Sequence, residues 1–384
     1  MAVYKLFPQK DASIYSFYPK MNTGIDSIIE IGNLNVNYDP VPQVFRFLVK
    51  FDQSEIEDVI DNKVGGMAFS SSLKCFIATA QGVISDTLLE VYPVSGSWNN
   101  GNGTYLDSPY TTNGVSWKYR TFSGSGGTQW LTTSYGDYVT GSYSGSFLGG
   151  GNWYTGSSDP THTDLTPTQS FDYRTTKDIN VNVSDIIKVW YSSSNSIGGY
   201  TSIKNEGFIV KWEDAVEFST SDAIQPIMQF YSVDTNTIYP PALEIKWDDQ
   251  VFTTGSLNEI STPDLYVALD NNPGVFYSGS INRFRLNVRE EFPVRAYQTS
   301  SLYTTNKFLN SGSQYAVKDL DTDEFVIDFD SQFTKISCDS TGNYFDIYMN
   351  GLEPERYYKI LIKTTISGST IVKDDKYYFK VVNG

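Results

Sequence analysis

Phe45-Arg46-Phe47-Leu48-Val49-Lys50-Phe51-Asp52 is the stretch that decides the fold. Its odd-numbered residues are all apolar and three of them are phenylalanine, whereas the even-numbered positions are mostly charged. A period of two is typical of a strand with one buried face. We therefore predict a strand here, with an aromatic face in a core and a mostly basic face turned outward. The polar run 52–54 predicts the turn that ends it.

Two later stretches repeat this alternation. Phe208, Val210 and Trp212 form one apolar face, and Leu243, Ile245 and Trp247 form another. A strand that is this apolar on one face needs partners with the same pattern. The three stretches are therefore candidates for one sheet or for two facing sheets.

Composition extends this prediction to the whole chain of 384 residues. Aromatic residues make up 15% of it, with 28 Tyr and 23 Phe, and they occur in short bursts between Gly, Asn, Ser and Asp clusters. Such residues favour pleated, half-buried surfaces, and no segment has the sustained periodicity of a long amphipathic helix. Short helical turns are expected only at 52–62 and after Ser184-Asp185, which resembles an N-cap. The fold class is predicted to be all-β, with two or three domains at this length.

Charge and targeting signals exclude several classes of protein. The net charge is −16 and charged residues are only 19% of the chain, which argues against a nucleic-acid partner. Neither a signal peptide nor a membrane-spanning run is recognisable, so we expect synthesis in a cytoplasm and no membrane partner. The two cysteines, Cys75 and Cys338, are expected to be buried free thiols.

Residues 95–170 differ in composition from the rest. Gly, Ser, Asn, Thr and Tyr dominate, few aliphatic residues occur, and the segment cannot build a core of its own. It must pack either on the domain that carries it or on a partner chain. Its aromatic side chains could form a protein interface, contact a sugar, or cap an open end of a sandwich. The candidates for interface or glycan contact are Trp98, Trp117, Tyr119, Trp130, Tyr143, Trp153 and Tyr154.

Catalytic chemistry has little support. His162, the only histidine, lies between Asp159 and Asp164, and a lone histidine in such a loop is most often a surface residue. No pair of His or Cys ligands stands at zinc spacing. Pairs of carboxylates for glycoside cleavage stay open, because 44 Asp and Glu make chance pairs abundant. We expect no enzyme and no cofactor.

One acidic run has the spacing of a calcium loop. Asp319, Asp321 and Asp323 alternate, and Asp330 falls at the twelfth position counted from Asp319. Oxygen ligands at alternate positions suit calcium. Glu324 occupies the sixth position, where an EF-hand needs Gly, so an acidic turn before a strand is the competing interpretation.

Several segments of the N-terminal two-thirds occur in an order shared with a known family. They are Asp11-Ala12 with Ile14, Asn22-Thr23-Gly24, Phe45 to Asp52, Trp98-Asn99-Asn100, Val115-Ser116-Trp117, Ile179 to Trp190, Asn205 to Val210, Phe218-Ser219-Thr220 and Pro241 to Ile245. On these segments, roughly residues 10–248 resemble the DNRLRE-type, carbohydrate-binding-module-like β-sandwich, from which the chain departs by a long insertion around 120–170. The resemblance implies a jelly-roll-like sandwich used for adhesion or as a structural module.

A second series of segments occurs in the C-terminal third. These segments are Asn282 to Arg289, Pro293-Val294-Arg295, Tyr315 to Asp319, Asn343 to Asp346, Gly351 to Tyr358 and Phe379-Lys380-Val381. The series resembles a module of virion structural proteins from large contractile-tailed phages, especially those of cyanobacteria and other marine bacteria, and this resemblance implies a part of a virion.

Independently, Gly351-Leu352-Glu353-Pro354 is similar to the linker before a late strand of immunoglobulin-like sandwiches, where Tyr357 or Tyr358 would anchor the corner.

These observations predict the following organisation. Residues 1–252 form a jelly-roll-like sandwich with the insertion at about 95–170, residues 253–261 form a linker, and residues 262–384 form one or two smaller immunoglobulin-like β domains. The expected function is that of a non-enzymatic bacteriophage structural protein of the tail, baseplate, fibre attachment or head decoration. It would be present as a homo-oligomer or in many copies among other virion proteins. The alternative is a receptor-binding adhesin that recognises host surface glycans through the aromatic insertion.

Overall fold

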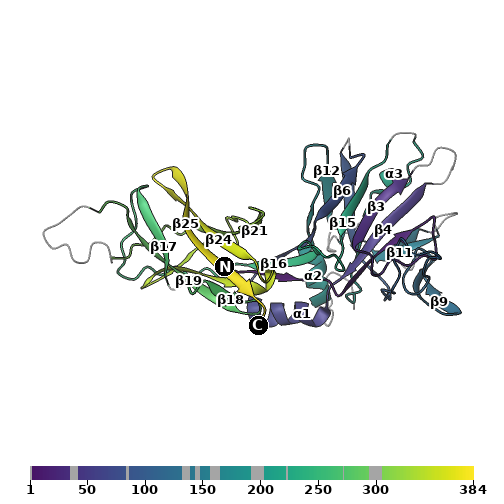
Figure 1. Cartoon of the computed structure of the whole chain (residues 1–384), viewed down its shortest axis with the longest axis horizontal. Coiled ribbons are helices and arrows are strands. Elements are labelled where there is room, and N and C mark those ends of the chain that lie inside the picture. Colours follow the sequence, from purple (N-terminus) through teal and green to yellow (C-terminus); the bar gives the residue numbers. More distant parts are fainter. Residues whose placement is uncertain are drawn as a thin grey trace. The chain divides into compact units, whose positions relative to one another are not determined.

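The computed structural model describes residues 2–34, 42–83, 86–131, 139–142, 148–155, 165–191, 203–221, 224–270, 272–293 and 305–384. Their regular structure is mostly strands, which join into largely antiparallel sheets (Figure 1), and the prediction of an all-β, sandwich-type fold is confirmed. The chain divides into two compact units. Unit 1 contains residues 1–5, 64–69 and 245–384, and unit 2 contains residues 6–63 and 70–244.

The large sheet of unit 2 has the order β12-β7-β14-β4-β3-β15-β6, and β2 pairs with β4 outside this path. Figure 1 shows β4, β3, β15 and β6 running side by side. Its strands are β2 (Lys10–Tyr15), β3 (Ile28–Leu34), β4 (Gln43–Lys50), β6 (Ile77–Gln81), β7 (Thr87–Pro93), β12 (Thr168–Phe171), β14 (Phe208–Trp212) and β15 (Ile227–Tyr231).

The remaining described strands up to Trp247 form smaller sheets. A four-stranded sheet has the order β1-β16-β5-β13, and two hairpin-like pairs, β8-β9 and β10-β11, lie within the insertion. Their bounds are β1 (Ala2–Leu6), β5 (Phe69–Cys75), β8 (Tyr119–Ser123), β9 (Gly126–Gln129), β10 (Val139–Ser142), β11 (Gly149–Tyr154), β13 (Ile179–Asn182) and β16 (Ala242–Trp247).

The three alternating stretches of the sequence are β4, β14 and β16. The first two pair antiparallel in the large sheet, with Phe208 opposite Val49 and Val210 opposite Phe47, whereas β16 belongs to the four-stranded sheet. Aromatic contacts fill the predicted core face, since the rings of Phe47 and Phe230 have centroids 5.8 Å apart and those of Phe51 and Phe208 6.2 Å apart. The aromatic face of β4 is therefore in a core, as its period of two predicts.

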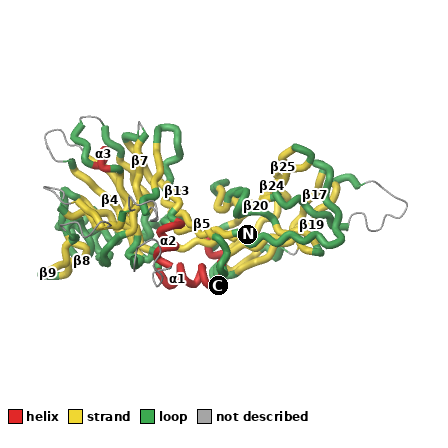
Figure 2. Tube along the Cα trace, turned by 180° about the vertical axis from the view of Figure 1, so that it is seen from behind, coloured by secondary structure: helices red, strands yellow, loops and turns green. Residues whose placement is uncertain are grey.

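The helices are short, as expected. Asp52 caps α1 (Gln53–Asp58), because its carboxylate accepts from the N–H groups of Ser54 and Glu55, and the chain then continues as a π-helical turn (Val59–Val64). In unit 2, α2 (Ser184–Tyr191) packs against α1 (Figure 2), and its Trp190 ring lies 4.7 Å from that of Phe208. A third helix, α3 (Asp214–Glu217), follows β14 directly. Among the described residues, no helix has the length and apolar character needed to cross a bilayer.

Unit 1 contains two further sheets, β17-β19-β23-β22 and β18-β25-β24-β20-β21. One hydrophobic cluster contains side chains from both, including Phe284, Phe345, Tyr315 and Phe379. Their strands are β17 (Leu265–Asp270), β18 (Val275–Tyr277), β19 (Ile281–Glu290), β20 (Gln314–Asp319), β21 (Phe325–Ile327), β22 (Ser337–Asp339), β23 (Gly342–Tyr348), β24 (Tyr357–Ile366) and β25 (Ser369–Val382), with a 3-10 turn at Met349–Gly351.

Tyr358 is the residue that anchors the corner before β24. Its buried hydroxyl donates a hydrogen bond to the backbone oxygen of Glu353 at 2.9 Å, whereas Tyr357 is exposed. The segment predicted as a linker, 253–261, lies inside unit 1, where the N–H of Thr253 donates to Cys338 O and that of Ile260 to Phe308 O. Cys75 in unit 2 and Cys338 in unit 1 are both free and buried.

The burial of the β4 side chains gives a first test. Phe47 is fully buried between large side chains, so we expect Phe47→Ala to lower the free energy of unfolding of unit 2 by about 3–5 kcal/mol. Leu106→Ala, at a position 89% exposed, should change it by less than about 0.5 kcal/mol. Denaturant titration followed by tryptophan fluorescence measures both. Equal effects of the two substitutions would contradict the position of Phe47 in the core.

Candidate functional site

The insertion covers the second face of the large sheet. Leu48 of β4 and Ile209 of β14 belong to one hydrophobic cluster with tryptophans of the insertion. These are Trp98, Trp117, Trp130 and Trp153, with exposed fractions of 1%, 1%, 2% and 6%. Of the two alternatives that the sequence left open, packing on the domain that carries the insertion is therefore the one found for its described residues.

Arg46 lies at the centre of this covered face. The sequence predicted a basic face turned outward, and that prediction is wrong, because the Arg46 side chain is 0% exposed. Its Nε and Nη2 donate to the two carboxylate oxygens of Glu217 at 2.6 and 2.7 Å, and its Nη1 donates to Gly150 O at 2.6 Å. The guanidinium also lies 4.9 Å from the Trp117 ring and 5.2 Å from that of Trp153. Burial of two charges carries a large desolvation penalty, and a bidentate pair whose remaining donor is also satisfied is the geometry that offsets it.

Short connections bring the partners of Arg46 into place. Glu217 is at the end of α3, which begins two residues after β14 and returns over the same face. Gly150 has a positive φ of 75°, and a Cβ there would lie 2.7 Å from Trp117 Cζ2 and 2.9 Å from Arg46 Nη1. Only glycine lets the backbone of the insertion approach the guanidinium this closely.

Lys211 extends the buried charges along β14. It stands opposite Glu90 in the antiparallel pairing of β14 with β7, and its Nζ lies 3.0 Å from that carboxylate. The same Nζ lies 2.9 Å from Asp214 and 3.6 Å from Glu217. The two buried cations, Arg46 and Lys211, are thus each paired with carboxylates, of which Asp214 reaches solvent because its side chain is 79% exposed. Such pairing stabilises the fold.

The tryptophans nominated for interface or glycan contact serve the interior instead. Trp98 Nε1 donates to Glu206 O at 2.8 Å, and Trp130 Nε1 donates to Ser116 O at 2.9 Å. With both ring faces in the core, these side chains offer no surface to a sugar or a partner, and the nomination of Trp98, Trp117, Trp130 and Trp153 is corrected on that ground. The occurrence of four tryptophans in a segment poor in aliphatic residues is the sequence feature that indicated a capping role for them.

The other nominated side chains have different outcomes. Tyr119 is partly exposed and packs on Phe122, with ring centroids 4.8 Å apart, and Tyr154 is also partly exposed. Tyr143 and His162, with Asp159 and Asp164, lie outside the described residues. For those four positions the sequence-based interpretation stays a prediction.

The acidic run nominated for calcium is held by internal partners. Burial acts to raise the pKa of Asp319, but Arg356 donates to both of its oxygens at 2.6 and 2.7 Å, and with two backbone N–H donors it holds that pKa below its usual value. Asp323 accepts from Lys318 and Lys359, and Asp330 accepts from the N–H groups of its own turn. No group of three or more metal-ligating side chains occurs in the described part of the chain. These contacts support the acidic-turn interpretation.

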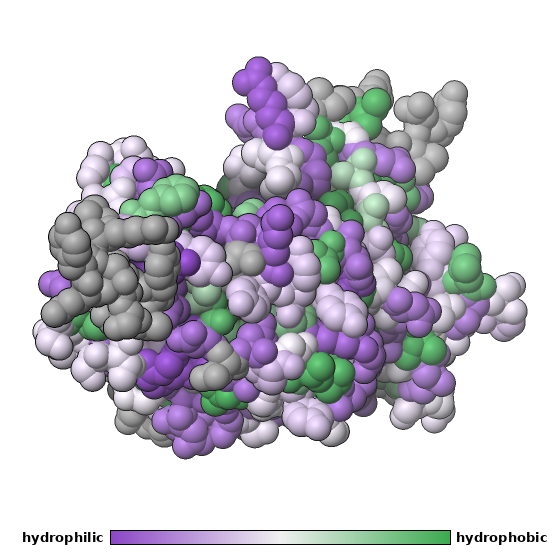
Figure 3. All heavy atoms as spheres, turned by 60° about the vertical axis from the view of Figure 1, so that its left-hand side comes forward, coloured by the Kyte–Doolittle hydropathy of each residue, from purple (hydrophilic) through white to green (hydrophobic). Residues whose placement is uncertain are grey.

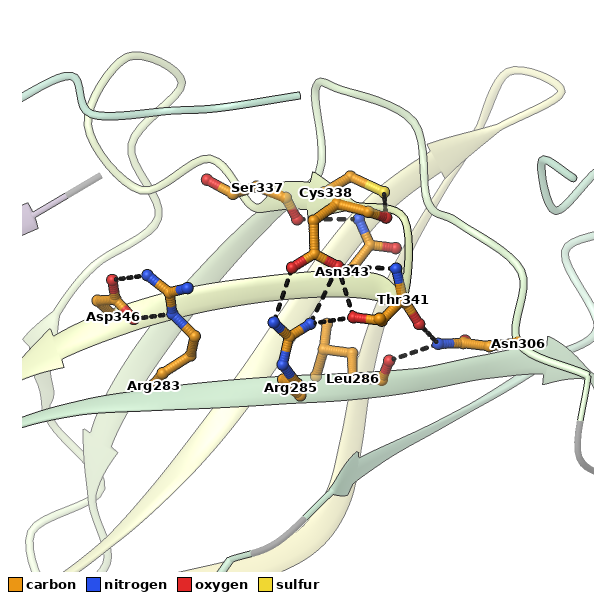
Figure 4. A network of polar contacts seen from close by, with 10 residues as sticks. Arg283, Arg285, Leu286, Asn306, Ser337, Cys338, Thr341, Asn343 and Asp346 are labelled. Carbon is orange, nitrogen blue, oxygen red and sulfur yellow. Dashed lines mark hydrogen bonds and ion pairs between the residues drawn. The ribbon is translucent and has the colours of Figure 1, made fainter. Parts of the chain in front are cut away.

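A polar network lies on the sheet β17-β19-β23-β22 (Figure 4). Arg283 makes a bidentate pair with Asp346 at 2.8 and 2.8 Å, and Arg285 makes another with Asp339 at 3.1 and 2.7 Å. The Arg285 contact is the largest cause that lowers the pKa of Asp339. Asn306 Nδ2 donates to Leu286 O and to Thr341 O, which ties the β22–β23 turn to β19. Since these arginines are paired, the network stabilises the sheet and presents little free positive charge.

Exposed aromatic residues gather at a place that the sequence did not indicate. Tyr18, Tyr105 and Tyr110, here called the tyrosine patch, have exposed fractions of 42%, 41% and 45%. Their ring centroids lie 6.4 Å apart for Tyr18 and Tyr105 and 6.2 Å apart for Tyr18 and Tyr110. On the face of the molecule shown in Figure 3, by contrast, hydrophobic residues form small separate areas among hydrophilic ones. The signal for the patch was the pair Tyr105 and Tyr110 within the insertion, but Tyr18 is too distant in sequence to be grouped with them.

Asp11 is a buried carboxyl that the sequence gave no reason to single out. It is on β2, is 1% exposed, and accepts from the N–H of Val233 at 2.7 Å. Burial raises its pKa to about 8; the Val233 N–H opposes this shift, and the nearby Asp234 and Asp26 add to it. The protonated acid is therefore the form that the fold prefers near neutral pH.

Comparisons with known proteins add no family. No family model and no curated protein matches the chain. Among solved structures, a DUF4785 family protein from Legionella pneumophila is 8% identical, with a TM-score of 0.17, and the match covers 100% of this chain and 62% of that one. A β-glucuronidase from Parabacteroides merdae is 8% identical, with a TM-score of 0.16 and coverage of 96% and 36%. The chain thus spans less than two thirds of either structure, and likenesses this weak carry no argument.

The buried pair provides a second test. We expect Arg46→Met and Glu217→Gln each to lower the free energy of unfolding by about 3–5 kcal/mol, because each leaves a buried charge without its main partner. Lys211, 3.6 Å from Glu217, should place Arg46→Met toward the lower end. The double variant Arg46→Met/Glu217→Gln should lose less than the sum of the two. Chemical denaturation followed by tryptophan fluorescence measures the cycle.

A matched control for that cycle exists in unit 1. Arg283→Met breaks a bidentate pair of similar geometry whose arginine side chain is 49% exposed. It should lower stability by no more than about 1 kcal/mol, because solvent screens the pair. Additive effects at Arg46 and Glu217, or equal effects at the buried and exposed pairs, would contradict the role of burial.

Asp11 predicts a pH dependence of stability. Its pKa in the folded state, about 8, is raised above the ordinary value of 3.8, so its stabilising contribution is complete below about pH 3.8 and is lost as the pH rises to about 8. One such group gives a slope of up to about 1.4 kcal/mol per pH unit between these values. Asp11→Asn keeps an acceptor for the Val233 N–H and should reduce the slope between pH 5 and pH 8. Denaturation midpoints at several pH values check this, and parallel curves for the two proteins would refute it.

Proposed function

We propose that the chain is a non-enzymatic structural protein of a bacteriophage particle, a component of the tail, baseplate, fibre attachment or head decoration. Its role is mechanical: β domains bury area against neighbouring subunits, and that burial provides the energy of assembly. The chain would be present in many copies or as a homo-oligomer, made in the host cytoplasm and found in the virion. The resemblance of Asn282 to Arg289 and of the later segments of unit 1 to virion modules supports the phage assignment.

The burial of the insertion's tryptophans is the observation that carries the proposal. Gly/Ser-rich loops with tryptophans suit sugar or substrate binding when the rings face solvent, but here Trp117 and Trp153 enclose the Arg46–Glu217 pair. The buried cations of this face, Arg46 and Lys211, likewise form ion pairs with Glu217 and Glu90. This arrangement fits a scaffold that must keep its shape, and it gives no support to catalysis.

The adhesin alternative has one observation in its favour. Tyr105 and Tyr110 belong to the insertion and are exposed, so host glycans could stack on them although they cannot reach the tryptophans. A glycan array with the whole chain, compared with a Tyr105→Ala/Tyr110→Ala variant, tests this alternative. Binding that the variant loses would favour the adhesin, and silence of the array would count against it.

The structural role is tested on particles. In purified virions of the phage that encodes the chain, quantitative mass spectrometry should find it at a constant number of copies per particle, retained after washing at high salt. A non-structural protein of the same phage is the control and should be absent. Presence of the chain in infected cells but not in the particles would overturn the proposal.

A further inference from the structure

Among the described residues, the tyrosine patch is a group of exposed aromatic rings in mutual contact whose partner has not yet been argued. Tyr18 and Tyr105 meet with their rings inclined at 66°, and the Tyr15 ring packs behind Tyr105 at 5.3 Å. Leu106, the next residue in the chain, is 89% exposed. Isolated exposed apolar residues need no explanation, but tyrosines that share contacts next to an exposed leucine are typical of interface anchors.

The patch is held rigidly before any partner arrives. The N–H of Tyr105 donates to Asp26 at 2.9 Å, and the loop that carries Tyr105 is closed on itself because Thr111 Oγ1 donates to Asp107 at 2.6 Å. Tyr15 in turn stacks on Phe45 of β4, with ring centroids 5.7 Å apart. Rings fixed in this way lose little freedom on binding, which is what makes tyrosine effective at interfaces.

The surroundings of the patch are acidic. The Glu30 carboxylate accepts from Tyr15 Oη at 2.5 Å and from Gln229 Nε2 at 2.8 Å, which fixes it beside the rings. After burial and Tyr18, its charge is the next cause that raises the pKa of Tyr105. Asp26 also adjoins Tyr105, because its carboxylate accepts from the Tyr105 N–H, and the chain as a whole carries a net charge of −16. Lys20, two residues after Tyr18, is the exposed basic residue that adjoins this surface in sequence.

We propose that the tyrosine patch docks an arginine-bearing segment of a neighbouring structural protein. A guanidinium is attracted to the faces of tyrosine rings and to carboxylates at their edge, while its aliphatic stem and adjacent apolar residues cover Leu106. Exposed aliphatic surface beside the rings fits a polypeptide better than a hydroxyl-rich sugar. The inference deepens the proposed function and rests on it in one respect: the partner is taken to be another subunit of the particle.

Two short peptides test the chemistry with the full-length chain. One carries two arginines among Gly and Ser, and the other carries citrulline at the same positions, which keeps the shape and removes the charge. Titration calorimetry should show saturable binding of the arginine peptide and at least about tenfold weaker binding of the citrulline peptide. The double variant Tyr18→Ala/Tyr105→Ala should weaken arginine-peptide binding by at least about tenfold.

Tyr277→Ala is the matched control, since Tyr277 is 62% exposed on β18 of unit 1 and should leave binding unchanged within about twofold. Thermal unfolding of each variant checks that it folds. Glu30→Gln, which keeps hydrogen-bonding capacity and removes the charge, should weaken the arginine peptide more than the citrulline peptide.

Each other outcome overturns the inference. The proposal of an arginine-bearing partner is refuted if the arginine peptide shows no saturable binding or if both peptides bind equally. It is also refuted if the double variant and Tyr277→Ala lose the same amount of binding. Oligosaccharide binding that the double variant loses, without peptide binding, would assign the patch to a glycan. The proposed function fails separately, if the chain is absent from purified particles although the peptide binds.

Discussion

The Arg46–Glu217 pair is the interaction on which unit 2 depends. A strand with phenylalanines on one side and arginine on the other would ordinarily stand at the surface, with the charge in water. Here Glu217, Gly150 O and two tryptophan rings replace that water, so the large sheet can be covered on both faces. Loss of Glu217 or of the Gly150 carbonyl would leave an Arg46 donor buried without its partner, and loss of a tryptophan ring would admit water to the pair. The covering layer is therefore coupled to the charge beneath it.

That coupling explains how a segment rich in Gly and Ser is ordered. Such residues lose much conformational freedom on folding, and the insertion has few aliphatic side chains to offset this loss. Its described residues use Trp98, Trp117, Trp130 and Trp153 instead, each of which buries a large area. Among the described aromatic residues of the insertion, these tryptophans are buried, Tyr119 and Tyr154 are partly exposed, and Tyr105 and Tyr110 are at the surface.

The sequence predicted those features that depend on neighbouring residues. The period of two located β4 and β14, the polar residues after Phe51 located the end of a strand, and Gly351 to Tyr358 located a corner that Tyr358 anchors. It did not predict the burial of Arg46, because the Glu217 carboxylate and the Gly150 carbonyl, which offset the desolvation penalty, are 171 and 104 residues away. For the same reason Tyr18 and Tyr105 could not be joined into one surface, and the acidic run at Asp319 could not be separated from a calcium loop until Arg356 was placed beside it.

A covered sheet would suit the structural role that we propose. An open aromatic face on eight strands would be a site for unspecific association, and strand edges and apolar faces are the surfaces through which β proteins aggregate. That face is buried, and the arginines Arg283 and Arg285 are paired with aspartates, so these described parts of the molecule add neither an open aromatic face nor much free positive charge. The tyrosine patch stays at the surface as a small group of rings in mutual contact. In the proposed role this group would direct how subunits meet, because the larger aromatic faces of the sheet are internal.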